Sequence, residues 1–341
     1  MAAFSHPTTY TKREHTMSHP RWPRRLLRIT AQFALGAVIL VNLAAAKLAY
    51  ISTHVLPADR PTFAQYATTP LAQAWGMLGG TTTDRPMSTA TPDVVGLAYE
   101  VRSIPLDAGE QLEAWYVPEA QPRGVAIMFT GYMAAKDSML RPAQELHQMG
   151  YACLLVDVRG AGGSSGELVT LGMREADDVA AAFGYAAQQW PGQPLVGYGI
   201  SMGATALMRA AAQGQIAPAA LILEGPFDSM LNTIGHRIER IAPRWPTSEL
   251  VLLWGSLEIG QNGFAHNPSA YARAVTCPVL LMRGERDPWV RAEDMAAIAA
   301  ALPTPPQVLT APGEGHTMPF AVGAPGLWVP AVRSFLGGLP Q

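Results

Sequence analysis

The chain of 341 residues is long enough for one large α/β domain with extra segments, or for two small domains. Apolar residues make up 49% of it and charged residues 15%, so the composition allows a sizeable buried core. The formal net charge of −2 gives no sign of a nucleic acid or another polyanion as partner. Glycine and proline, 32 and 29 residues, occur without a repeat period, which excludes collagen-like and solenoid folds.

An uncharged apolar run at residues 29–46 follows a basic N-terminal segment, residues 1–28. A membrane-spanning helix needs about 20 such residues. Positive flanks stay in the cytoplasm, so the chain after the run is expected on the extracytoplasmic side. We therefore predict a transmembrane or signal-anchor segment at 29–55. A signal peptide cleaved at 44–46, which would release a secreted protein, and a buried core helix are the alternatives.

Residues 56–93 are rich in proline and threonine and are predicted to form a linker, with a short helix at about 71–78. Beyond them, alternating apolar and polar residues at 97–104 and 111–117 predict a hairpin.

Short apolar runs, bounded by glycine, proline or aspartate and separated by helical patterns, follow the hairpin. These runs begin at Val125, Ala152, Pro194, Ala219, Pro278 and Pro306. Uninterrupted apolar strands are typical of a parallel sheet that helices cover on both faces. Residues 94–341 are thus predicted to form a mostly parallel, doubly wound α/β sheet. About fifty residues without a strand-like run predict a helical cap insertion at about 227–274.

A G-x-S-x-G motif, Gly199 to Gly203, lies between a predicted strand and a predicted helix. That context is typical of a nucleophile turn, which exposes the serine hydroxyl at the edge of the sheet. Side chains two positions before and after the serine would collide, so glycine occupies both. Ser201 is therefore the candidate nucleophile.

A serine hydroxyl needs a base within hydrogen-bond reach, and the base needs an acid to orient it. After such a turn the acid and the histidine follow in chain order. Asp287 comes at the end of one predicted strand and His316 after the last, and carboxyl ends of parallel strands gather at one edge. We predict Asp287 as acid and His316 as base, with Asp294 and Glu285 as alternative acids.

The tetrahedral intermediate of acyl transfer also needs donors for its oxyanion. The backbone N–H of Met202, directly after the nucleophile, is the first candidate. The loop after the Val125 strand supplies the second, for which we predict the N–H of Tyr132.

Four stretches together resemble the α/β-hydrolase superfamily, and within it a serine-aminopeptidase-like branch with an N-terminal membrane anchor. They are YGISMGA around Ser201, a D-x-R-G-x-G-x-S run at 157–164, CPVLLMRGERDPWV and GEGH. The resemblance covers about residues 95–340. Many members have His-Gly where this chain has Thr130-Gly131; that histidine supports the oxyanion loop and is not a triad member. We expect Asp157 and Arg159 to stabilise the loop that contains them.

The resemblance implies the α/β-hydrolase fold and a serine hydrolase that cleaves an ester, thioester or amide through an acyl-enzyme on Ser201. A carboxylic ester hydrolase is favoured, with a peptidase as the alternative. An acyltransferase on the same fold and a non-catalytic binding protein are the rival functions. The superfamily hosts many substrates, so these motifs do not select one.

No cluster of His, Asp or Glu has the spacing of metal ligands, and neither metal nor cofactor is expected. The expected partners are a small-molecule or lipid-like acyl substrate and, through the N-terminal segment, a membrane. Apolar residues of the insertion fit an acyl pocket or the core of the cap equally well: Trp245, Leu250, Leu252, Leu253, Trp254 and Phe264. Cys153 and Cys277 belong to separated strands and should remain unpaired.

Overall fold

The computed structural model describes residues 22–56, 83–316 and 319–339 and divides into two compact units, one up to Leu43 and one from Ala44 onward. Helix α1 (Trp22–Thr53) begins in the first unit and ends in the second. Arg25–Thr53 is long and apolar enough to cross a membrane, although a signal sequence or a core helix passes the same test. Most of the linker predicted at 56–93, including the short helix at 71–78, lies outside the described residues, as does most of the basic segment 1–28.

An eight-stranded sheet forms the centre of the second unit, with strand order β1-β2-β4-β3-β5-β6-β7-β8. The strands are β1 (Glu100–Pro105), β2 (Gln111–Val117), β3 (Val125–Phe129), β4 (Ala152–Val156), β5 (Leu195–Ile200), β6 (Ala220–Glu224), β7 (Val279–Gly284) and β8 (Gln307–Ala311). The predicted hairpin is the antiparallel pair β1–β2, and β2 also pairs antiparallel with β4. Every other pairing is parallel. The predicted mostly parallel, doubly wound sheet is thus confirmed.

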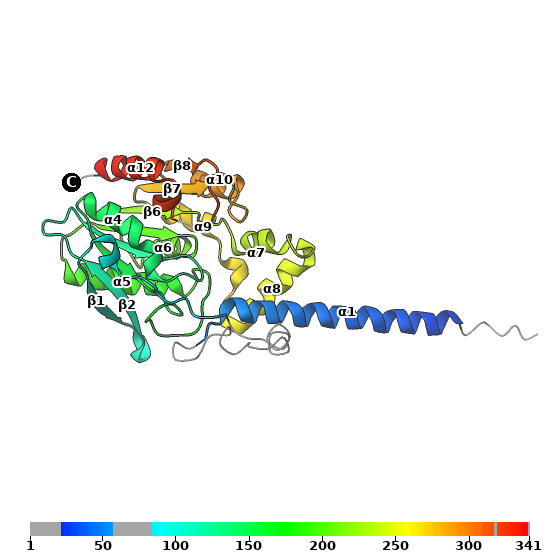
Figure 1. Ribbon diagram of the computed structural model, residues 1–341. Helices are drawn as coiled ribbons and strands as arrows, with labels where there is room; N and C mark the ends of the chain where they lie inside the picture. Colours follow the sequence, from blue (N-terminus) through cyan, green and yellow to red (C-terminus); the bar gives the residue numbers. More distant parts are fainter. Residues whose placement is uncertain (1–21, 57–82, 317–318, 340–341) are drawn as a thin grey trace, which may run out of the picture. The chain divides into compact units, whose positions relative to one another are not determined.

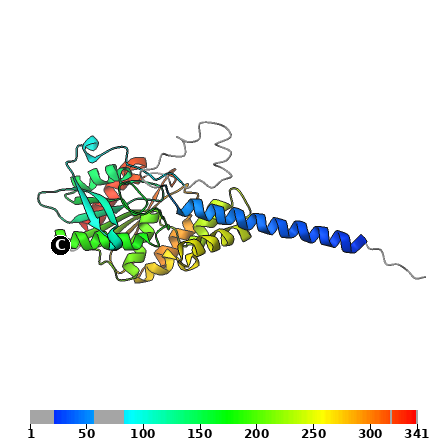
Figure 2. The same cartoon turned by 90° about the horizontal axis from the view of Figure 1, so that it is seen from below.

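The central strands are apolar along their whole length because helices cover both faces of the sheet (Figures 1 and 2). Val125, Ile127 and Phe129 of β3 pack into one hydrophobic cluster, and the alternating Ala126 and Met128 pack into another. The first cluster includes α5 (Glu175–Gln189), α6 (Met202–Ala212) and α10 (Ala292–Ala301); the second includes α4 (Leu140–Gln148), α11 (Phe320–Gly323) and α12 (Pro325–Gly337).

The interval predicted as a cap contains α7 (Met230–Ile238), α8 (Arg244–Ile259) and the short α9 (Pro268–Tyr271). The Ser229 hydroxyl caps α7 by accepting a hydrogen bond from the Asn232 N–H. Helix α8 ends at Gly260, whose φ of 67° suits glycine at a helix C-terminus.

The last turns of α1 pack against this helical insertion. Ala45 and Ala49 are buried in one cluster with Ile238 of α7 and Val251 of α8. Just beyond the helix, the N–H of Val55 donates to the Glu167 carbonyl at 2.9 Å. The last turns of α1 therefore pack as part of the second unit. The sequence had predicted a separate segment joined to the enzyme by a linker.

Both cysteines are free thiols, as predicted. Cys153 lies in β4 and Cys277 immediately before β7, and strands β3, β5 and β6 separate them in the sheet. Burial raises the pKa of the Cys153 thiol and stabilises its neutral form.

Candidate active site

Ser201 lies at a sharp turn between β5 and α6, in the strand–turn–helix context that the motif predicted. Its φ of 50° and ψ of −108° are costly for a residue with a side chain. The Ser201 N–H donates to the Glu224 carbonyl at 2.7 Å, and the Gly203 N–H donates to the Thr130 carbonyl at 3.1 Å. These bonds tie the turn to the neighbouring strands and hold the serine in its strained conformation.

The two motif glycines are required by space. A Cβ on Gly199 would lie 2.6 Å from the backbone nitrogen of Ala204. A Cβ on Gly203 would lie 2.5 Å from the carbonyl oxygen of Phe129. Both contacts involve backbone atoms, so no side-chain rotation can relieve them. Helix α6 can approach β5 and β3 this closely only because both positions lack a side chain.

The structure brings Ser201, His316 and Asp287 together in one hydrogen-bonded chain. His316 Nε2 lies 2.9 Å from Ser201 Oγ, and His316 Nδ1 lies 2.6 Å from Asp287 Oδ2. The other carboxylate oxygen of Asp287 accepts the N–H groups of Trp289 and Val290, each at 2.9 Å. Asp287 is 7% exposed and Ser201 6% exposed, so bulk water competes little for these bonds.

The alternative acids have other partners. Asp294 accepts the Arg291 N–H at 2.7 Å at the start of α10 and lies 3.6 Å from the ring of His236. Glu285 accepts the Gly313 N–H at 2.9 Å. Among the described residues, only Asp287 supplies a carboxylate oxygen within hydrogen-bond distance of His316.

The loop after β3, predicted to provide an oxyanion donor, lies beside the nucleophile. A Cβ on Gly131 would be 3.6 Å from the Cβ of Ser201. The Thr130 hydroxyl donates to the Ala134 carbonyl at 3.0 Å, a hydrogen bond within this loop. The Tyr132 phenol donates to the Ser52 carbonyl at 2.8 Å and links this loop to α1. Met202 begins α6, where backbone N–H groups have no intrahelical acceptor.

Lys136 fixes the far end of this loop, a role that the sequence did not reveal. Its side chain is 1% exposed, lies 4.5 Å above the Trp115 ring, and pairs with Asp157 and, at 2.7 Å, with Glu113. Burial raises the pKa of Asp157, while the lysine acts against that shift. The Asp157 carboxylate thus holds the loop after β3, whereas the sequence predicted that it stabilises the loop that contains it. One signal was present: Lys136 is one of only three lysines in the chain.

Arg159, the other charged residue of this motif, has its own buried partner. Its Nε donates to Asp178 of α5 at 2.6 Å. This ion pair fits the expected loop-stabilising role.

Glu224, at the end of the apolar strand β6, is a second buried ionisable residue that sequence reasoning missed. Its carboxylate accepts the Tyr198 hydroxyl and the Trp328 indole N–H, both at 2.6 Å, and the Phe320 N–H at 3.0 Å. Its carbonyl accepts the Ser201 N–H. Burial raises the pKa of Glu224 to about 7, although these donors oppose the shift. One residue thus connects the nucleophile turn with the segment that follows His316.

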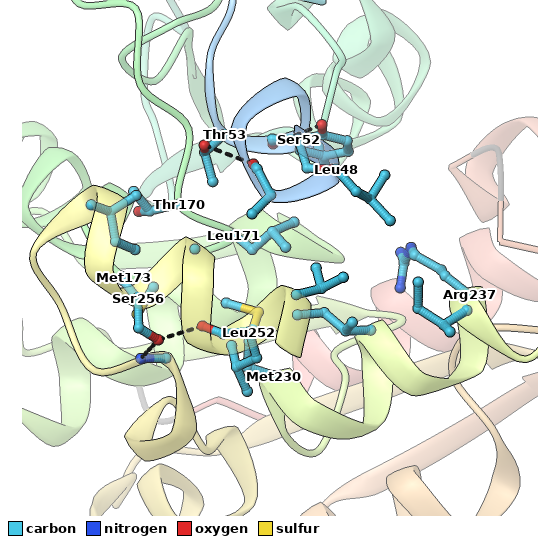
Figure 3. Close-up of a pocket in the computed structure, with 18 of the residues that line it drawn as sticks. Leu48, Ser52, Thr53, Thr170, Leu171, Met173, Met230, Arg237, Leu252 and Ser256 are labelled. Carbon is cyan, nitrogen blue, oxygen red and sulfur yellow. Dashed lines mark hydrogen bonds between the residues drawn. The ribbon is translucent and has the colours of Figure 1, made fainter. Parts of the chain in front are cut away.

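A cavity of about 200 Å³ lies beneath the cap, within the second unit (Figure 3). The end of α1, the Tyr132 loop, residues 170–173, and helices α7 and α8 form its walls. Of the apolar insertion residues proposed for an acyl pocket, Leu252 lines the cavity, and Leu250 and Trp254 pack between cap and α1. Trp245, Leu253 and Phe264 are exposed instead.

Comparisons with known proteins agree with this architecture. The fold and site define an α/β-hydrolase, and a family model described as serine aminopeptidase, S33, matches residues 120–249, which include Ser201. A protein of Mycobacterium tuberculosis H37Rv described as uncharacterized is 31% identical over 238 residues, covering 67% of this chain and 75% of the relative. The chain belongs to this serine aminopeptidase-like family of α/β-hydrolases.

Solved structures share the fold at lower identity. An esterase of Pyrococcus furiosus is 21% identical with a TM-score of 0.63, covering 75% of this chain and 97% of the esterase. Est1E of Butyrivibrio proteoclasticus, solved with ferulic acid bound, is 21% identical with a TM-score of 0.57, covering 70% of this chain and 98% of Est1E.

Glu224→Gln should change how stability depends on pH. The native pKa of about 7 exceeds the ordinary 4.5, so between these values the folded chain holds a proton that the unfolded chain has lost. Stability from this group is therefore full below about pH 4.5 and declines by about 3 kcal/mol as pH rises through 7. Urea unfolding at several pH values should show this component in the wild type and not in Glu224→Gln. The exposed Glu293→Gln is the matched control; parallel curves for all three proteins would contradict the expectation.

Proposed function

We propose that the protein is a serine hydrolase that cleaves a carboxylic ester through an acyl-enzyme on Ser201. The observation that carries the proposal is the hydrogen-bonded chain from Ser201 through His316 to Asp287, at 2.9 and 2.6 Å. These hydrogen bonds connect a nucleophile, a base and an acid that orients the base.

In the proposed mechanism, Ser201 Oγ attacks the carbonyl carbon while its proton passes to His316 Nε2. Asp287 holds the Nδ1–H and stabilises the imidazolium that forms. The N–H groups of Met202 and Tyr132 stabilise the oxyanion. Collapse breaks the bond to the leaving group, which takes the proton from His316. Water, deprotonated by the same nitrogen, then releases the acid and restores Ser201.

The lining of the cavity favours an acyl ester over an aminopeptidase substrate. Recognition of a protonated α-amino group calls for a carboxylate, and no aspartate or glutamate is among the described residues that line the cavity. The lining is mostly apolar, with Met173, Met230 and Leu252 among its residues. Ser201, His316 and Asp287 do not line the cavity, but Tyr132 of the loop beside Ser201 does. We therefore propose an acyl chain, from a small-molecule or lipid-like ester, as the group that fills it.

Ser201→Ala should lower kcat for a para-nitrophenyl ester by about 10⁶-fold, the magnitude known for triad loss in a related mechanism. The same change should abolish labelling by a fluorophosphonate. Folding should persist, because the change removes one hydroxyl and leaves the packing of the turn intact. Ser103→Ala, on the edge strand β1, is the control and should hydrolyse and label normally. Hydrolysis by Ser201→Ala within tenfold of the wild type would remove Ser201 from the nucleophile role.

Asp287→Asn should lower kcat by about 10⁴-fold, because an amide in this place favours the wrong tautomer of the histidine. Asp294→Asn is the matched control: it alters a buried carboxylate that is bonded to Arg291 and lies near His236 instead. Its kcat should stay close to that of the wild type. If Asp294→Asn is the crippling change and Asp287→Asn is mild, the acid has been assigned wrongly.

We further propose that α1 is an uncleaved anchor and that the catalytic unit lies outside the cytoplasm. The apolar run, the basic residues before it and the near-complete exposure of its most apolar stretch support the anchor. The burial of Ala45 and Ala49 against the cap also supports it. Cleavage at 44–46 would remove part of a packed helix, which argues against a signal peptide.

Reporter fusions after Gln341 test this topology. A reporter that folds only outside the cytoplasm should be active there, and one that works only inside should be silent. The intact chain should also stay in the membrane fraction after a carbonate wash. Activity of the inside reporter alone would overturn the external placement, and a soluble chain beginning at Lys47 would overturn the anchor.

A further inference from the structure

Arg237, on cap helix α7, brings a positive charge to the otherwise mostly apolar cavity. Its guanidinium donates to the Thr233 carbonyl at 2.9 Å and to the Thr233 hydroxyl. It also stacks on the Trp289 ring, 4.8 Å from the ring centroid. Figure 3 shows Arg237 at one end of the cavity, while Met173 and Ser256 lie at the other end.

The guanidinium of Arg237 has no carboxylate within ion-pair distance among the described residues. Arg159, by contrast, pairs with the buried Asp178. Burial lowers the pKa of Arg237, and the charge of Asp287 acts against that shift. Yet both oxygens of Asp287 already accept hydrogen bonds, from His316 and from two backbone N–H groups. An arginine stays charged in proteins, so this partly buried cation has no carboxylate of its own among the described residues.

Arg237 is connected to His316 through one aromatic ring. The Trp289 ring that it covers is in edge contact with the His316 ring, with centroids 5.2 Å apart. The cation is therefore one aromatic ring away from the base. An acyl chain would fit the apolar end of the cavity, which is lined by residues such as Met173 and Leu252. With an acyl chain at that end, a group bound to Arg237 lies at the opposite end of the cavity, on the side of Trp289 and His316.

We propose that Arg237 binds an anionic group on the leaving-group side of the substrate. The substrate class is then an amphiphile, with an acyl chain in the cavity and a carboxylate or phosphate close to the ester. This inference rests on the hydrolase function proposed above. A guanidinium suits both anions, because its fork of N–H donors matches their paired oxygens.

The charge balance of the reaction supports the same assignment. When His316 takes the proton of Ser201 it becomes a cation, and Arg237 would then face a second positive charge across Trp289. An anion bound to Arg237 compensates this repulsion as the transition state forms. With a neutral ester, Asp287 and the oxyanion still balance the imidazolium but Arg237 gains no anion of its own, so the benefit should appear in kcat/KM for anionic esters.

The test uses the full-length protein in detergent and two substrates with the same acyl chain. One is the para-hexanoyloxybenzoate anion and the other its neutral methyl ester; para-hexanoyloxyphenyl phosphate replaces the carboxylate by phosphate. The wild type should prefer the anions. Arg237→Gln should lower kcat/KM for them by roughly 10- to 100-fold, the value of a charge-assisted hydrogen bond. The neutral ester should change little. Arg237→Lys should restore part of the loss.

Arg240→Gln is the matched control, because Arg240 is an exposed arginine just after α7. Equal losses on neutral and anionic esters in Arg237→Gln would overturn the proposal and leave a structural role. An equal loss of the anionic preference in Arg240→Gln would overturn it in favour of surface charge. Either result leaves the hydrolase function standing as long as Ser201 still reacts with a fluorophosphonate. Loss of that reaction in the wild type would instead remove the function itself.

Discussion

The backbone conformation of Ser201 is the constraint on which the site depends. A non-glycine residue at such a φ costs on the order of 1–3 kcal/mol, and it persists only where the surroundings fix it. Here the fixing groups are backbone atoms of strands on both sides: the Glu224 carbonyl and the Thr130 carbonyl. The close approach of α6, which both motif glycines permit, also fixes this conformation. The Ser201 hydroxyl thus lies at the carboxyl end of the central strand β5, next to the loops that follow β3, β7 and β8.

Buried ionisable side chains also hold the loops around Ser201 in place. Lys136 and Asp157 hold the loop after β3, and Glu224 holds the segment after His316 through the Phe320 N–H. A buried ion pair contributes little net stability, but breaking one is costly because the remaining charge has no partner. Such groups favour one loop arrangement over others. Together they place donors, base and acid around one hydroxyl before any substrate arrives.

Some parts of this picture were predictable from the sequence, because they depend on local pattern. The uninterrupted apolar runs predicted the parallel strands, and the glycines around Ser201 predicted the strand–turn–helix context. Chain order after the turn selected Asp287 and His316, which the structure brings within hydrogen-bond distance of each other. Glu224 and Lys136 were not predicted, because the side chains they bond are 21 or more residues away and no motif joins them. Arg237 was not predicted because its contact with Trp289 joins residues 52 positions apart. The packing of Ala45 and Ala49 on the cap could not be predicted either, because small apolar residues at these positions are equally compatible with a membrane helix.

Acylation of Ser201 can be followed with a substrate whose acyl-enzyme hydrolyses slowly. The full-length protein is treated with a para-nitrophenyl carbamate, and nitrophenol release is followed together with peptide mass spectrometry. We expect stoichiometric nitrophenol release, a carbamoyl group on the Ser201 peptide and a parallel loss of esterase activity, which recovers as the carbamate hydrolyses. A carbamoyl group on another residue, with Ser201 unmodified while activity is lost, would contradict the acylation of Ser201.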